Sequence, residues 1–130
     1  MSHPFQYVTL RCVPRVDRGE FVNVGVVVFS QSAGVLLCAW ELDEARVLAL
    51  DPRVDLEALR GALDTVVRIC AGESGAGLPS LPTLGRRFGW IAAPRSTVVQ
   101  PGPLHGGECA DPAAAVGELM RRHVTVEGAS

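Results

Sequence analysis

The chain of 130 residues contains no lysine, so all 12 of its basic side chains are arginines. Without a side-chain amine it forms neither a Schiff base nor the lysine contact of a phosphate-binding P-loop. Aromatic residues make up only 5% of the chain, so valine, leucine and alanine must supply most of the core. The formal charge of −2 lacks the basic excess typical of nucleic-acid-binding domains, and nucleic acid is not an expected partner.

Paired cysteines are also missing, because Cys12, Cys38, Cys70 and Cys109 are widely spaced and form no Cys-x-x-Cys motif. This spacing favours buried free thiols over a disulfide framework. His105 and Cys109 are spaced like two metal ligands, but zinc needs three or four and the other cysteines belong to distant elements. We therefore expect no bound metal, no disulfide and no cofactor.

Long hydrophobic runs are missing as well. The longest, around Val22 to Phe29, is too short to span a bilayer as a helix. The N-terminus lacks the charged region and apolar run of a signal peptide, so we expect a cytoplasmic protein without a membrane partner. A length of 130 residues and a hydrophobic content of 48% predict one domain, residues 1–130, with a packed core.

Three segments predict an antiparallel meander of strands, at Phe5–Val13, Phe21–Phe29 and Val35–Glu41. The middle segment is apolar on both faces, which predicts a strand in the interior of the sheet. Strict alternation along it places four valines on one face, namely Val22, Val24, Val26 and Val28. Asn23 and Gly25 would then share the opposite face.

The rest of the chain predicts mostly helices. Helical spacing and capping residues favour helices at Glu44–Leu50, from about Asp55 to Gly72, at Leu81–Trp90 and from Asp111 onward. A fourth strand is predicted at Ser96–Gln100 and a loop at Gly102–Cys109. The expected fold class is therefore α+β, a single domain in which helices pack an antiparallel sheet made of the meander and this fourth strand.

One segment puts polar groups on an otherwise apolar strand, the run Arg18-Gly19-Glu20-Phe21-Val22-Asn23-Val24-Gly25-Val26. A buried asparagine is costly unless it is hydrogen-bonded, and a glycine inside a strand often marks a bulge or a close backbone approach. If the strands pair, Asn23 and Gly25 could lie beside Thr9 and Arg11. The candidate binding site is therefore Arg11, Arg18, Glu20 and Asn23. An architectural interpretation remains open, in which Asn23 bonds loop backbone, Arg18 pairs with Glu20 and Gly25 accommodates a crossing helix.

These residues also carry a family resemblance. Tyr7, Arg11, Pro14 and the run from Arg18 to Val26 resemble an uncharacterised bacterial family, catalogued as a domain of unknown function, with the motif Arg-Gly-Glu-Phe-x-Asn-Val-Gly-Val. Weaker similarity continues through Asp51-Pro52, through Ala93–Ser96 and into the last predicted helix. The resemblance implies no established activity. It does imply a partner, since such proteins look like small companions of HipA-like Ser/Thr kinases.

Two functions remain open. The first is a non-catalytic companion or adaptor that binds another protein, such as a HipA-like kinase. The alternative is a small enzyme that uses Arg11, Arg18, Glu20 and Asn23 at the mouth of the strands to bind an anion and move a proton. This set has no evident nucleophile or metal, and it contains a single carboxylate. We therefore favour the adaptor.

Overall fold

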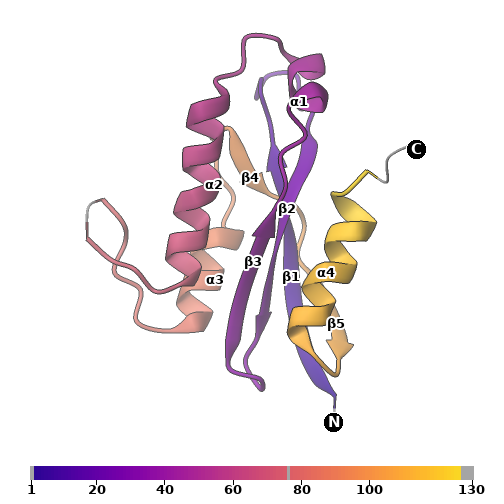
Figure 1. Ribbon diagram of the computed structural model, residues 1–130. Helices are drawn as coiled ribbons and strands as arrows, with labels where there is room; N and C mark the ends of the chain where they lie inside the picture. The colour runs from indigo at the N-terminus through magenta and orange to yellow at the C-terminus, as the bar shows by residue number, and fades with distance from the viewer. Residues whose placement is uncertain (1, 76, 127–130) are drawn as a thin grey trace.

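An antiparallel sheet forms the centre of the molecule, and helices lie on both of its faces (Figure 1). The computed structural model describes residues 2–75 and 77–126. Within them the strands are β1 (His3–Cys12), β2 (Val22–Ser30), β3 (Val35–Trp40), β4 (Val99–Pro101) and β5 (His105–Cys109). The helices are α1 (Glu44–Leu50), α2 (Leu56–Cys70), α3 (Leu84–Ala92) and α4 (Pro112–His123). The α+β fold class is confirmed.

The strand order is β3-β2-β1-β4, and β5 pairs with the other half of β1. Residues 10–12 of β1 pair with β4, while residues 3–7 of the same strand pair with β5. Strand β2 lies between β1 and β3, so its predicted interior position is confirmed. One edge of the sheet is thus β3, and the other is shared by β4 and β5.

The prediction of a loop at Gly102–Cys109 was wrong, because His105–Cys109 forms β5. This strand has two glycines and is largely exposed, so it lacks the apolar alternation by which strands are recognised. Its backbone pairing with β1 defines it instead. The predicted strand Ser96–Gln100 is shorter and shifted, since β4 begins at Val99 and includes Pro101. Proline is tolerated there because β4 is an edge strand.

A β-bulge in β2 overturns the predicted sharing of faces. Leu10 pairs with Gly25 but Arg11 pairs with Asn23, so Val24 is an extra residue between them. Val22 and Val24 belong to one core cluster, whereas Val26 and Val28 belong to another on the opposite face. A Cβ at Gly25 would lie 3.2 Å from Leu10 Cδ1 and 2.7 Å from the carbonyl oxygen of Ala39. Gly25 therefore faces away from Asn23, and the two do not share a face.

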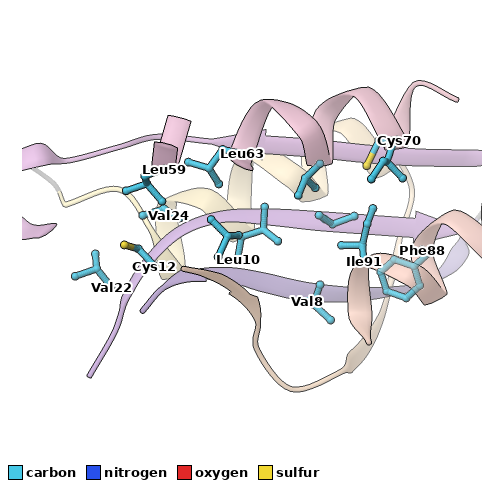
Figure 2. Close-up of a cluster of buried hydrophobic side chains, with 14 of the residues drawn as sticks. Val8, Leu10, Cys12, Val22, Val24, Leu59, Leu63, Cys70, Phe88 and Ile91 are labelled. Atoms are coloured by element: carbon cyan, nitrogen blue, oxygen red, sulfur yellow. The ribbon is translucent and has the colours of Figure 1, made fainter. Parts of the chain in front are cut away.

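The larger core cluster lies between the sheet and helices α2 and α3, and Figure 2 shows part of it. The smaller cluster lies under α4, where Leu119 and Val124 pack against Val26 and Val28. The predicted caps of two helices are confirmed: Asp55 accepts a hydrogen bond from the Ala58 amide at 3.0 Å, and Asp111 caps α4. Helix α3 starts later than predicted because Thr83 caps it, after Pro82.

No helix in the described part of the chain combines the length and apolar character needed to cross a lipid bilayer. All four cysteines are free thiols, and Cys12 and Cys70 are buried. Burial raises the pKa of Cys12 to about 11, so this thiol stays protonated at neutral pH.

Candidate functional site

Arg11 lies near the C-terminal end of β1, in the part of that strand that pairs with β4. It lies opposite Asn23 on β2 and opposite Gln100 on β4. Its side chain is half-buried, and its guanidinium carbon is 3.9 Å from the centroid of the Phe21 ring. Its Nε is buried and has no hydrogen-bond partner among residues 2–75 and 77–126. Nor does any carboxylate of this described region form an ion pair with Arg11.

The chain after β4 holds Arg11 from the other side. The Gly102 amide donates to the Thr9 carbonyl oxygen at 2.8 Å, which pulls this backbone against β1. A Cβ at Gly102 would lie 2.4 Å from Thr9 Oγ1 and 3.1 Å from Arg11 Nε. Glycine allows this close approach, and the Arg11 side chain lies between Gly102 and the Phe21 ring.

Arg11 lines a cleft of about 390 Å³ at this edge of the sheet, which we call the Arg11 cleft. Its lining contains two arginines and no acidic residue: Arg11, Ala92, Pro94, Arg95, Gln100, Pro101, Gly102, Pro103 and Leu104. Leu104 is 54% exposed, and Phe21 on the other side of Arg11 is 42% exposed. The cleft is therefore positively charged and is bordered by exposed apolar side chains.

Arg18 and Glu20, the charged residues of the motif, pair with each other. Arg18 Nε is 2.5 Å from Glu20 Oε1, and their side chains are 56% and 46% exposed. Among the described residues, no hydrogen bond or ion pair joins either of them to Arg11 or Asn23. The local pairing matches the architectural interpretation of these two residues, and their exposure also leaves them accessible to a partner.

Asn23 is next to Arg11 across the strands, as the pairing of β1 and β2 suggested. Its Nδ2 donates to the carbonyl oxygen of His123 at 3.2 Å, at the C-terminal end of α4. Helix ends leave carbonyl groups without intrahelical partners, and Asn23 supplies a donor for one of them. The structure thus brings together two of the four predicted residues, Arg11 and Asn23, and gives the second a role in anchoring α4.

Two residues next to Arg11, Phe21 and Arg95, were not among the four predicted site residues. Phe21 was assigned to a strand, but β2 begins one residue later and its ring stays exposed over Arg11. Arg95 lies 84 positions after Arg11 in the chain, and only the fold places both in one cleft. In the sequence, Phe21 directly follows the polar residues Arg18-Gly19-Glu20, and this position was a signal that its ring could be exposed.

A cluster of aromatic and histidine rings lies under α4. The Tyr7 hydroxyl is 3.5 Å from His123 Nε2, and the rings of Tyr7 and His105 stack with centroids 5.2 Å apart. Burial, followed by the nearby charges of Arg122 and His105, lowers the pKa of His123. This side chain is therefore neutral at physiological pH, as expected for a hydrogen-bonded residue of the α4 interface.

The suggested ligand pair His105 and Cys109 does not converge on one point. They occupy the two ends of β5, and four residues of extended strand span about 13 Å. Within residues 2–75 and 77–126, no group of three or more His, Cys, Asp or Glu side chains is placed to hold a metal ion.

Comparison with known proteins identifies the family. Residues 7–124 match the model of a family described as a protein of unknown function, DUF3037. The chain belongs to this family. Every residue of the Arg11 cleft lies inside the matched DUF3037 range, as do Arg18, Glu20, Phe21 and Asn23. No curated protein and no solved structure matches the chain.

Proposed function

We propose that this protein is a non-catalytic companion that binds another protein through the Arg11 cleft and the exposed residues beside it. The observation that carries the proposal is the half-buried Arg11 guanidinium, which no carboxylate of the described chain neutralises. Arginine and aromatic residues with exposed apolar neighbours are the typical composition of interface hot spots. Phe21 and Leu104 provide that apolar contact on the two sides of Arg11.

The charge of the cleft defines the chemistry of the partner. Arg11 and Arg95 line it without any acidic residue, so an incoming carboxylate meets two positive charges. Arginine binds carboxylates through two parallel hydrogen bonds, which gives both affinity and orientation. The proposed partner therefore places an aspartate or glutamate in the cleft and apolar side chains on Phe21 and Leu104.

Arg18 and Glu20 extend this proposed surface. Glu20 immediately precedes Phe21, and both charged side chains are exposed. The resemblance of the Arg18–Val26 motif to companions of HipA-like kinases supports a HipA-like Ser/Thr kinase of the bacterial cytoplasm as the partner.

A catalytic role for the same residues has less support. Arg18 and Glu20 bind each other, and the Asn23 amide donates to helix backbone. The enzyme hypothesis needs these groups around one substrate, yet of the four only Arg11 lines the cleft. Protein binding does not need these four residues to meet around one substrate. Arg11 in the cleft and the exposed Arg18 and Glu20 can contact different parts of one partner.

Co-purification tests the proposal. The full chain is used as bait in its native host, captured proteins are identified by mass spectrometry, and binding is repeated with the purified kinase. We expect Arg11→Gln and Phe21→Ala to lose at least tenfold in affinity, as hot-spot residues do. Arg18→Ala should weaken binding less, because an exposed charge contributes mainly to the association rate.

Two matched variants control for general effects. Val126→Ala truncates another exposed apolar side chain, and Arg121→Gln removes another exposed positive charge, both outside the cleft. Urea unfolding of each variant separates lost binding from lost stability. Equal capture by wild type, Arg11→Gln and Phe21→Ala, all folded, contradicts the proposal.

A further inference from the structure

A second cavity lies between β4 and helices α2 and α3, and it adjoins the Arg11 cleft, with which it shares Arg95, Gln100 and Pro101. It has a volume of about 260 Å³. Its walls are mainly apolar and come from the larger core cluster: Leu10, Ala62, Val66, Trp90, Ile91 and Val99. Figure 2 labels two of these, Leu10 and Ile91, in the core beneath α2. Concave apolar sites with a few polar groups are the usual form of small-molecule sites.

Arg95 lines this cavity, and contacts with Trp90 and Ala93 orient its side chain. Its guanidinium carbon is 4.1 Å from the centroid of the Trp90 ring. Its Nε donates to the Ala93 carbonyl oxygen at 3.4 Å, and its Nη2 donates to the Trp90 carbonyl oxygen. These contacts orient the group and leave Nη1 free of hydrogen bonds within the described chain.

The partners of Arg95 are neutral, although the group is partly buried. Burial lowers the pKa of Arg95, which means that its surroundings disfavour the charged form. Within the part of the chain that the structure describes, no carboxylate forms an ion pair with it. A desolvated cation without a counter-charge gains more from an anion than an exposed one does.

The other polar side chains of the cavity are already bonded to backbone. Thr65 donates to the carbonyl oxygen of Gly61 at 2.9 Å, and Thr97 donates to that of Val99 at 2.7 Å. The side-chain Nε2 of Gln100 donates to the carbonyl oxygen of Thr97 at 3.0 Å. Arg95 is therefore the charged group that selects what enters.

We propose that this cavity binds a small carboxylate with an apolar chain, such as a medium-chain fatty acid. The chain lies between Val66, Ile91 and Val99, and the carboxylate accepts hydrogen bonds from Arg95. Arg95, Gln100 and Pro101 line both this cavity and the Arg11 cleft, whereas Val66, Ile91 and Val99 line the cavity and not the cleft. The inference can still be tested separately from the proposed protein partner, because octanoate binding is measured on the chain alone.

Calorimetry of the whole chain with octanoate tests the inference. We expect saturable binding of one octanoate, and weaker binding of hexanoate and butanoate by about fourfold per methylene removed. Octan-1-ol has the same chain without the charge, and it should bind about tenfold to a hundredfold more weakly than octanoate. Trp90 lines the cavity, so bound octanoate should also change the tryptophan fluorescence.

Two variants and one control locate the site. Arg95→Gln should weaken octanoate binding by about tenfold to a hundredfold and leave octan-1-ol nearly unchanged. Ala62→Phe fills the cavity from α2 and should abolish binding of both. Arg86→Gln removes an exposed arginine of α3 outside the cavity and should bind like wild type.

Equal affinity of the wild type for octanoate and octan-1-ol overturns the role of Arg95, and this comparison needs no variant. Octanoate binding that does not depend on chain length, or that persists in folded Ala62→Phe, overturns the assignment to the cavity. Absence of octanoate binding at millimolar concentration refutes the site, whatever protein the chain captures.

Discussion

Arg11 and Arg18 belong to neighbouring parts of the same sequence segment but have different environments. The Arg18 side chain is 56% exposed and bonded to Glu20, whereas Arg11 is half-buried against Phe21. An exposed ion pair contributes little to stability because water and salt screen it. Removing Arg11 or Arg18 takes away one positive charge in either case. The removal of Arg11 is expected to lower the free energy of unfolding more than the removal of Arg18.

The exposed pair should be dispensable for folding. Arg18→Ala and Glu20→Ala are each expected to change the free energy of unfolding by less than about 0.5 kcal/mol, as ordinary surface substitutions do. Asn23→Ala should destabilise by about 1 kcal/mol, because it removes the hydrogen bond to the His123 carbonyl oxygen. Urea unfolding of the three variants measures both effects. If Arg18→Ala lowers the free energy of unfolding by more than about 1 kcal/mol, its ion pair with Glu20 is architectural.

His123 should make stability depend on pH. Its pKa is lowered from the usual 6.5, so below that pH the unfolded chain takes up a proton before the folded one does. The free energy of unfolding should therefore fall as the pH decreases from about 7 toward 5. Unfolding at pH 7 and pH 5.5 measures the slope, and His123→Gln should reduce it. The slope is expected to be shallow because the ring is only partly buried.

At the scale of elements, two glycines should respond in opposite ways to the same change. A Cβ at Gly25 in β2 would lie 2.7 Å from the Ala39 carbonyl oxygen and 2.9 Å from Trp40 Cβ, so Gly25→Ala should destabilise by about 1–3 kcal/mol. A Cβ at Gly61 in α2 meets nothing within 4 Å, so Gly61→Ala should stabilise by about 0.5–1 kcal/mol through helix propensity. Thermal unfolding of both variants measures these changes. If Gly25→Ala leaves the stability unchanged, the close approach of β3 to Gly25 is contradicted.

The elements that the sequence predicted are those with a strong pattern. The meander and the Asp55 and Asp111 caps follow from local apolar spacing and capping chemistry, which act within a few residues. The bulge at Val24 does not follow from local spacing. The segment is apolar at Val22, Val24, Val26 and Val28 with or without a bulge, and the bulge changes only how β2 pairs with β1. Gly25 was the local sign of it.

The candidate site was predictable only in part for a similar reason. Arg11 and Asn23 come from strands adjacent in sequence, so their pairing could be expected. Arg95, Gly102 and Leu104 reach the cleft through contacts between segments some 90 residues apart. Strand β5 was missed because its exposed glycines carry no periodic signal, and only the backbone of β1 defines it.

At the scale of the whole molecule, the sheet should be unevenly protected. Strand β2 is bonded on both sides and almost entirely buried, whereas β5 is bonded to β1 alone and largely exposed. Amide hydrogens of β2 should therefore exchange only through global opening, and those of β5 through local opening, orders of magnitude faster. Exchange followed by mass spectrometry tests this. Equal protection of β5 and β2 would indicate that a second chain covers this edge.

The long-range pairing of β1 also constrains how the protein is made. Strands β2 and β3 are available soon after β1 leaves the ribosome, but β4 and β5 follow only with residues 99–109. At about 5–20 residues per second, the 69 residues from Trp40 to Cys109 take about 3–14 s to translate. During that interval the nascent meander has an open strand edge along β1, which is a template for pairing with other chains. We therefore expect the edge of β1 from Leu10 to Cys12, whose apolar side chains are buried in the folded protein, to stay unpaired until β4 has been synthesised.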